Sequence, residues 1–215
     1  MKIDGKASTR HVHKKENLNI TGWQNAKLSN INRLSKFKTV EYLEEKACKE
    51  LDKFSDFEIP KPNQIMRFMT TFRHNPLGLI THYIDLHGSV DEVVIFMYQC
   101  KKIVVDLLLE YVRLGKIKHM KFLICKRYAY NYEENTFVAS LVNFSEKYPD
   151  KLTFKYPDNH AKIVCIDVGN GIDYPTITGS GNLTLNARVE NYIMENCKDS
   201  FDFYNNFFDS LKNDK

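Results

Sequence analysis

The sequence predicts an α/β protein: a mixed β-sheet flanked by helices on both faces, preceded by a basic N-terminal extension. Apolar runs of strand length alternate with amphipathic helical segments from about residue 76 onward, and this alternation is typical of a sheet covered by helices. The 215 residues, 43% hydrophobic and 27% charged, suit one substantial core with an extension. We therefore expect residues 1–60 to form the extension and residues 61–215 to form the α/β domain.

The N-terminal segment is strongly basic. Residues 1–40 contain nine Lys and Arg residues against Asp4 and Glu16, although the whole chain carries a net charge of only +4. A basic arm that follows a nucleic-acid backbone has this composition. A solvated tail has it equally well, so both interpretations stay open.

A helix is predicted between the basic segment and the domain. In residues 39–54 the apolar side chains recur at helical spacing, which places on one face Val40, Leu43, Ala47, Leu51 and Phe54. The two prolines of residues 59–63 end this pattern, because proline disfavours helical backbone in the residue before it. The extension is therefore expected to hold an amphipathic helix and to end in a linker.

The elements of the domain follow from periodicity and from stop signals. Helices are predicted at 76–86, 102–114 and 136–148, ended by Gly88, Gly115 and Pro149. A continuous apolar run predicts a strand at 93–98, and shorter apolar-rich stretches predict strands at 121–125, 152–156 and 174–178. A closing helix from Ser200 places on one face Phe201, Tyr204, Phe208 and Leu211.

A pair of residues with chemical potential stands at the entrance of a further predicted strand, over 160–167. Turn-forming residues 157–159 lead into this strand and place His160 at its start. On a strand His160 and Lys162 share a face, about 6.6 Å apart along the backbone, so that both can act on one phosphate as nucleophile and charge clamp. Asp167 has the opposite parity, which favours a supporting role over a catalytic one.

A second polar cluster follows the strand predicted at 174–178. Glycines at 179 and 181 permit close backbone approach, and Ser180 and Asn182 offer small polar groups that suit a phosphate oxygen. Glu190 can accept a hydrogen bond from the imidazole and fix its tautomer. Tyr98, at the end of the first predicted strand, can line the cleft. The predicted catalytic residues are His160, Lys162, Ser180, Asn182 and Glu190, and the predicted supporting residues are Asp167, Gly179 and Gly181.

At these residues the chain resembles the phospholipase D superfamily, whose signature is His-x-Lys, four residues, Asp, and then a short segment ending in Gly-Ser-x-Asn. Six positions match in order: His160, Lys162, Asp167, Gly179, Ser180 and Asn182. Glu190 falls where small nuclease members of the family carry an acidic residue. The gap before Gly179 is longer than in the signature, and the Asn-Gly pair at 170–171 indicates a hairpin that accounts for the difference.

The resemblance implies a phosphodiesterase that uses a covalent phosphohistidine and neither a metal nor a cofactor. Family members that act on lipids usually contain two copies of the signature, whereas this chain contains one. A homodimer is therefore expected to complete the site, and the basic arm makes DNA or RNA the preferred substrate. Two alternatives remain: a nucleic-acid-binding or regulatory protein without turnover, and, less favoured, a phospholipase.

Two classes of protein are disfavoured by composition. The sequence has no stretch of eighteen apolar residues and no leader pattern at Met1, so we expect neither a membrane span nor a signal peptide, and a cytoplasmic location. Its five cysteines are an odd number without a Cys-x-x-Cys pair, so neither a disulfide framework nor a zinc site is expected. Buried thiols are expected in the apolar runs, at Cys100, Cys125 and Cys165.

Overall fold

The structure, a computed structural model, describes residues 44–51, 59–70, 74–127, 137–184 and 189–212. The basic segment at residues 1–40 lies outside these ranges. One compact unit extends from Thr39 to Lys215 and contains the sheet. The boundary expected at residues 60 and 61 falls inside this unit, between its first two strands.

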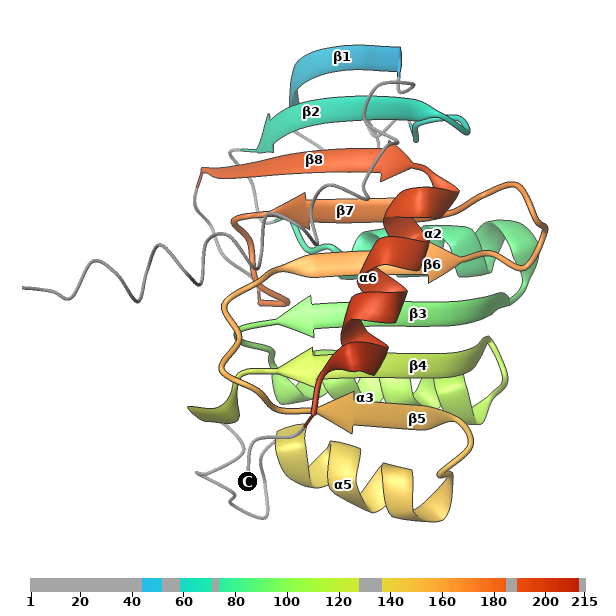
Figure 1. The fold of residues 1–215 in the computed structure, drawn as a ribbon, viewed down its shortest axis with the longest axis vertical. Coiled ribbons are helices and arrows are strands. Elements are labelled where there is room, and N and C mark those ends of the chain that lie inside the picture. The colour runs from blue at the N-terminus through green and yellow to red at the C-terminus, as the bar shows by residue number, and fades with distance from the viewer. Residues whose placement is uncertain (1–43, 52–58, 71–73, 128–136, 185–188, 213–215) are drawn as a thin grey trace, which may run out of the picture. The chain divides into compact units, whose positions relative to one another are not determined.

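The centre of the unit is a mixed sheet whose strands, in the described residues, number eight and follow the order β1-β2-β8-β7-β6-β3-β4-β5 (Figure 1). The strands are β1 (Glu44–Leu51), β2 (Gln64–Thr70), β3 (Val90–Met97), β4 (Ile117–Ile124), β5 (Leu152–Lys155), β6 (Ile163–Asp167), β7 (Pro175–Gly179) and β8 (Glu190–Asn196). Neighbouring strands β3, β4 and β5 are parallel, whereas β6, β7 and β8 alternate in direction.

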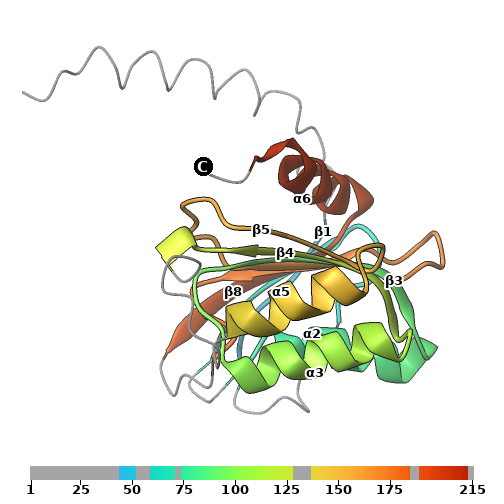
Figure 2. The same cartoon turned by 90° about the horizontal axis from the view of Figure 1, so that it is seen from below.

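Helices cover both faces of this sheet, as the sequence predicts. Of the helices whose bounds the structure describes, three lie on one face and a fourth on the other (Figure 2). The three are α2 (Leu77–His87), α3 (Lys102–Arg113) and α5 (Phe137–Lys147), and the fourth is α6 (Lys198–Ser210). The predicted fold class, a mixed sheet flanked by helices on both faces, is therefore confirmed.

The helices form where apolar spacing and end signals agree. In α3 the buried residues are Val104, Val105, Leu108, Leu109 and Val112, which recur at the spacing of one helical face. Gly115 follows with a φ of 73°, a conformation that glycine adopts without steric cost. The segment β3-α3-β4 is thus a parallel crossover unit, and α5 joins β4 to β5 in the same way.

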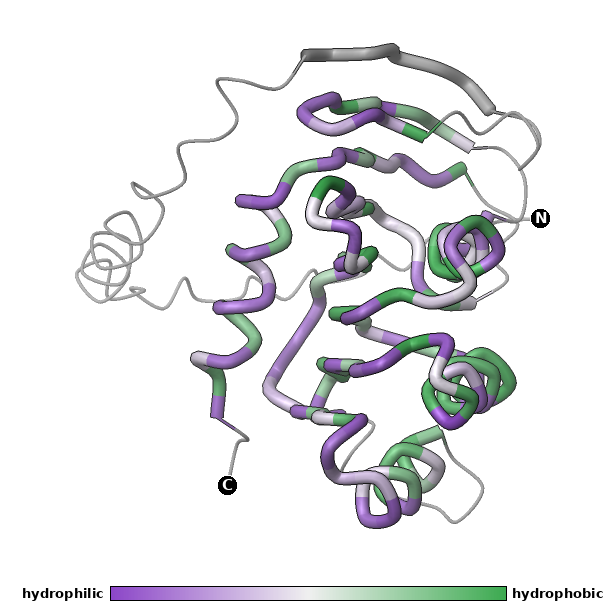
Figure 3. Tube along the Cα trace, turned by 90° about the vertical axis from the view of Figure 1, so that its right-hand side faces the viewer, coloured by the Kyte–Doolittle hydropathy of each residue, from purple (hydrophilic) through white to green (hydrophobic). Residues whose placement is uncertain are grey.

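The core has two parts, one on each side of the sheet. The larger part lies between the sheet and α2, α3 and α5, and the smaller lies beneath α6. Residues 93–97 of β3 are all buried, because they contact helices on both faces. In Figure 3, α2 and α3 are more hydrophobic than α6, which carries polar residues between its apolar positions. Cys100, Cys125 and Cys165 are buried, as expected.

The helix predicted at 39–54 is wrong where the structure describes it. Residues Glu44–Leu51 form strand β1, which pairs in parallel with β2. Their Glu, Lys, Ala and Leu residues favour helix locally, but pairing with a neighbouring strand outweighs so weak a preference. Strand β2 had no counterpart in the sequence prediction.

The hairpin predicted at residues 170–171 is present between β6 and β7. Asn170 Oδ1 accepts hydrogen bonds from the backbone N–H groups of Ile172 and Asp173, both at 2.9 Å. Gly169 and Gly171 have φ angles of 83° and 73°, which a side chain would disfavour. In the described part of the chain, no helix is long and apolar enough to cross a membrane.

Candidate active site

The predicted site residues come together where several strands end on the same side of the sheet. Strand β3 ends just before Tyr98, β7 ends just before Ser180, and β6 and β8 begin beside Lys162 and at Glu190. Because β6 is antiparallel to β3, β7 to β6 and β8 to β7, these four ends are neighbours. The topology therefore gathers residues that are far apart in the sequence.

His160 and Lys162 are adjacent but lie just before β6 and not on it, so the predicted strand begins later than expected. The ladder between β6 and β3 begins at the pair Ile163–Phe96, and the chain ahead of Ile163 leaves the sheet. Lys162 Nζ lies 3.5 Å from His160 Nδ1 and donates a hydrogen bond of 3.0 Å to the His160 carbonyl. The imidazole and the ammonium can therefore act on one bound group.

The ammonium of Lys162 is half-buried. Loss of hydration lowers the pKa of Lys162 below its usual value, and the negative charge of Glu190 acts in the opposite direction. A bound phosphate would oppose the effect of burial in the same way as Glu190 does. The position of Lys162 therefore suits a cation that stabilises negative charge on a ligand.

Tyr98 forms one wall beside the imidazole. Its ring lies 4.6 Å from the ring of His160, measured between centroids, and Lys162 Nζ lies 5.6 Å from the centre of the tyrosine ring. Arg127 Nη1 donates a hydrogen bond of 3.2 Å to the Tyr98 hydroxyl. That Tyr98 lines the cleft stays a prediction; in the structure its ring packs against the imidazole and restricts its rotation.

Glu190 does not orient the imidazole as expected; in the described residues its hydrogen-bond partner is Ser180. The Ser180 hydroxyl donates to Glu190 Oε2 and accepts a hydrogen bond of 3.1 Å from the Asn191 backbone N–H. The register explains the difference, because Gly179 pairs with Tyr192 and so brings Ser180 to the start of β8. His160 lies one strand further away, beyond β7.

Gly179 and Gly181 leave room for the ring of Tyr192. A Cβ at Gly181 would overlap the Tyr192 hydroxyl oxygen, and a Cβ at Gly179 would overlap the Asn191 carbonyl oxygen and the Tyr192 ring. Tyr192 is only 2% exposed and stacks on Phe68 with 5.2 Å between ring centroids, so it cannot easily move. Both glycines therefore support the shape of the turn that presents Ser180.

Asn182 is tied to the loop that follows β3. Its Oδ1 accepts a hydrogen bond of 3.2 Å from the backbone N–H of Gln99. Nearby, the Lys101 N–H donates to the carbonyl of Leu183 at 3.2 Å. These bonds fix the Asn182 amide so that its nitrogen can donate to a ligand.

Asp167 lies at the opposite end of β6 from the cluster, roughly 16 Å from Lys162 by the rise of a strand. Its Oδ1 accepts a hydrogen bond of 2.8 Å from the backbone N–H of Gly169, at the start of the hairpin. The other seven predicted site residues gather at the other end of the sheet. The carboxylate of Asp167 thus shapes a turn away from the site, which agrees with the supporting role expected from its parity.

An open cavity of about 410 Å³ adjoins the cluster and is lined by residues that include Lys162, Ser180 and Asn191. Its polar lining includes the Lys162 ammonium, the Ser180 hydroxyl and the Asn191 amide, a combination that suits an anion with several oxygens, such as a phosphate. Within the described residues, no group of three His, Cys, Asp or Glu side chains is placed to hold a metal ion.

Sequence reasoning missed two residues that complete this picture. Arg127, which contacts the Tyr98 hydroxyl, comes just after β4, and Tyr192, which sets the glycine requirement, lies inside β8. Arg127 could have been predicted as a site residue, because it follows a predicted strand of a parallel pair. The ends of such strands meet at one edge of a sheet. Nothing in the local sequence indicates the contact of Tyr192 with the glycines.

Comparisons with known proteins add little to this geometry. No family model matches the sequence, and no curated protein matches it. Among solved structures, the chain is similar to the phosphatidylserine synthase of Haemophilus influenzae Rd KW20, with 14% sequence identity and a TM-score of 0.44. The match covers 67% of this chain and 37% of that one, so the chain spans well under half of that protein's length. The resemblance to the phospholipase D superfamily rests on the signature residues.

Proposed function

We propose that this protein is a metal-independent phosphodiesterase, a nuclease that cleaves DNA or RNA through a covalent phosphohistidine at a site shared by two copies of the chain. The observation that carries the proposal is the contact between His160 and Lys162 at the strand ends that also present Ser180 and Asn182. An imidazole can attack phosphorus, and the three other groups can hold the phosphoryl oxygens.

The proposed reaction has two displacements. In the first, an imidazole nitrogen of His160 bonds to phosphorus, the bond from phosphorus to the leaving oxygen breaks, and that oxygen takes a proton from a general acid. In the second, a water molecule attacks phosphorus, the phosphorus–nitrogen bond breaks, and the same group, now a base, takes the proton of the water. Lys162 and the Asn182 amide stabilise the negative charge on the phosphoryl oxygens in both steps.

The general acid in this scheme is His160 of a second copy. In the described residues around it, the imidazole contacts Tyr98 and Lys162, and neither is a second histidine. A twofold axis beside the cluster would bring two such imidazoles to the same phosphate, with one neutral and one protonated. Activity should then be greatest in an intermediate pH range.

The decisive experiment compares wild type with His160→Ala on end-labelled single- and double-stranded DNA and RNA in EDTA, from pH 5 to pH 8. We expect cleavage by wild type and a loss of at least a thousandfold in the variant, because the nucleophile is gone. His82→Ala is the matched control, since His82 is exposed on α2 and should be dispensable. Intact substrates with wild type, or cleavage that survives in His160→Ala, would refute the proposal.

A nucleic-acid-binding protein without turnover is the second candidate, and the excess of basic residues in 1–40 is the observation that favours it. Binding of this kind weakens steeply with salt, because it releases ions from the phosphate backbone. Salt-dependent binding that is equal in wild type and His160→Ala, with no cleavage by either, would support this candidate over the nuclease.

A further inference from the structure

A second cavity, of about 440 Å³, adjoins the first, and both are lined by Ala161, Ile163 and Tyr204. It separates α6 from the residues just before β6, and its walls are mainly apolar. Aromatic side chains that line it are Phe96, Phe203, Tyr204 and Phe207. The first cavity is lined by polar groups that suit a phosphate, so this one provides a different environment next to it.

The cavity is open to a ligand bound at the proposed site, because His160 itself lines it. A chemical group attached to a phosphate at His160 can therefore enter the cavity without a change in the fold. Pockets of this size commonly take small molecules or parts of them. Its occupant must be a part of the phosphodiester that packs well against apolar, aromatic side chains.

Its aromatic rings are arranged to stack on a planar group. Phe203 and Phe207 lie four residues apart on α6, with 6.5 Å between ring centroids and 21° between their planes. Phe207 is 42% exposed although it is a large apolar residue, and its ring lies 6.1 Å from that of Phe96. The exposed carboxylate of Asp158, on the segment between β5 and β6 that also lines the cavity, can accept a hydrogen bond from an amino group at the edge of a base.

We propose that this cavity binds an unpaired nucleobase next to the phosphate that His160 attacks, so that the enzyme acts on single strands. This inference rests on the proposed nuclease function. Stacking on aromatic side chains is how proteins bind single-stranded nucleic acid with little sequence preference. A base within a duplex is paired and stacked, and it must leave the duplex before it can enter such a cavity.

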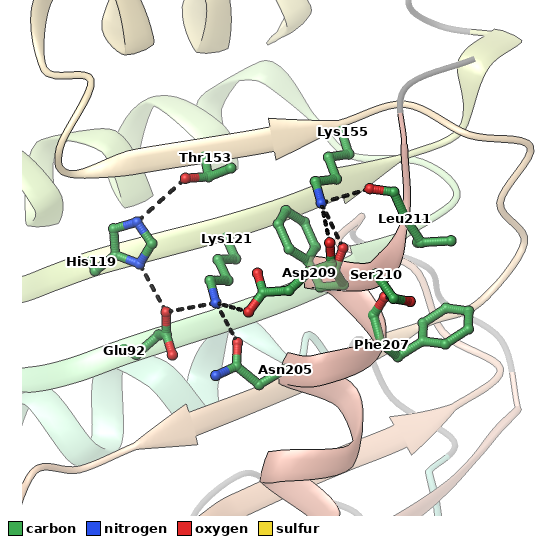
Figure 4. A network of polar contacts seen from close by, with 11 residues as sticks. Glu92, His119, Lys121, Thr153, Lys155, Asn205, Phe207, Asp209, Ser210 and Leu211 are labelled. Atoms are coloured by element: carbon green, nitrogen blue, oxygen red, sulfur yellow. Dashed lines mark hydrogen bonds and ion pairs between the residues drawn. The ribbon is translucent and has the colours of Figure 1, made fainter. Parts of the chain in front are cut away.

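Polar contacts hold the helical wall of the cavity in place (Figure 4). Lys121 Nζ donates to Asn205 Oδ1 at 2.6 Å and to Asp209 Oδ2 at 2.9 Å, both on α6. Lys155 Nζ donates to the carbonyl oxygens of Phe208, Asp209 and Leu211 at 2.8, 3.1 and 2.8 Å. The aromatic residues therefore belong to a helix whose end is fixed to β4 and β5, which keeps the cavity open for a ligand.

Phe207→Ala tests this inference on a single-stranded oligonucleotide and on the same strand with one abasic residue. We expect wild type to cleave next to the abasic residue about tenfold more slowly than at the normal position, because the stacking energy is lost. Phe207→Ala should cleave the normal strand about tenfold more slowly than wild type and should not distinguish the two strands. Phe207→Tyr keeps the ring and should behave as wild type does.

Controls separate this effect from damage to the fold. Leu86→Ala removes a side chain that is 64% exposed on α2, on the other face of the sheet, and should change neither rate. Urea unfolding and mass in solution are measured for each variant. If Phe207→Ala turns a dimer into a monomer, the cavity binds a second copy and the inference is wrong. If liposomes are hydrolysed in a Phe207-dependent manner and oligonucleotides are not, its occupant is a lipid chain.

The failure of this inference differs from the failure of the proposed function. Cleavage that depends on His160 but is indifferent to both Phe207 and the abasic residue overturns the nucleobase site alone. If wild type cleaves nothing, wild type is titrated with fluorescent five-nucleotide strands that carry or lack bases. Tighter binding of the strand with bases, abolished by Phe207→Ala, supports the site, and equal binding of both strands overturns it.

Discussion

At the scale of single residues, His74 connects the environment of the site to pH. It is 3% exposed, and its ring lies 4.7 Å from that of Tyr192, the residue against which Gly179 and Gly181 are packed. Burial lowers the pKa of His74 from 6.5 to about 4, because the charged imidazole loses its hydration. The folded protein therefore keeps this residue neutral at a pH where the unfolded chain protonates it.

This difference predicts a loss of stability in mild acid. Between pH 6.5 and pH 4 the unfolded chain binds a proton at His74 that the folded protein does not, so the free energy of unfolding falls as the pH is lowered. From pH 7.5 to pH 5 the contribution is about 2 kcal/mol. Urea unfolding at the two pH values should show this loss in wild type and not in His74→Phe.

The control for this measurement is His82→Phe, since His82 is exposed on α2. It should lose stability between the two pH values as wild type does. The expectation fails if His74→Phe retains the full pH dependence, because the loss would then arise from other groups.

Residue by residue, the sequence predicted contacts between near neighbours in the chain better than contacts between strands. His160 and Lys162 could be paired in advance because they are two positions apart, and their spacing holds in almost any extended backbone. The partner of Glu190 could not be predicted, because it depends on the register between β7 and β8. This register brings Ser180 closer to Glu190 than the imidazole is. Local spacing is visible in a sequence, whereas register is set by tertiary structure.

At the scale of elements, α6 depends on contacts to the sheet. Lys155, on β5, donates to three carbonyl oxygens at the C-terminal end of the helix, a place where a cation is favourable and where carbonyls otherwise lack partners. Partial burial lowers the pKa of Lys155 from its ordinary value. The side chain thus contributes both hydrogen bonds and charge to the anchoring of α6.

Lys155→Met should lower the free energy of unfolding by about 1–3 kcal/mol, because three carbonyls, two of them in part-buried hydrogen bonds, lose their donor. The substitution should speed up amide hydrogen exchange at the end of α6 more than it does in β3. The matched control is Lys118→Met on β4, which breaks an exposed ion pair with Asp91 and should cost less than about 1 kcal/mol. Equal effects of the two substitutions would show that Lys155 does not anchor the helix.

Elements also differed in how well the sequence predicted them. The helices α2, α3 and α5 were identified because each combines an apolar face with a clear stop signal. Strand β1 was not identified, because its residues favour a helix. It is a strand because it pairs with β2. The fully buried strands of the centre were easier to identify, since a run of apolar residues in β3 has few alternatives.

At the scale of the whole molecule, the proposed mechanism needs two chains. The described site contains one His160 with its cation and polar groups, and the reaction needs an acid as well as a nucleophile. Nuclease activity should therefore depend on whether both chains of a dimer carry His160, and not only on the total number of chains that carry it.

Mixing wild type with His160→Ala tests this dependence. When equal amounts exchange subunits freely, about one quarter of the dimers carry two intact histidines. Activity should then be about half of that expected if each wild-type chain acted alone. Single-turnover cleavage after co-refolding, with mass measured in parallel, gives the answer. Mixing wild type with His82→Ala should leave the activity per chain unchanged. An active monomer would contradict the shared site.

The connection between β5 and β6 has a further consequence. Because β5 lies at one edge of the sheet and β6 near its centre, this short segment passes the ends of β4 and β3, and Lys126 N–H holds it through the carbonyl of Pro157 at 2.9 Å. It carries His160 and also forms a wall of the aromatic cavity. Under the two proposals made above, rate and substrate choice depend on one stretch of backbone, and a change in its length is expected to alter both.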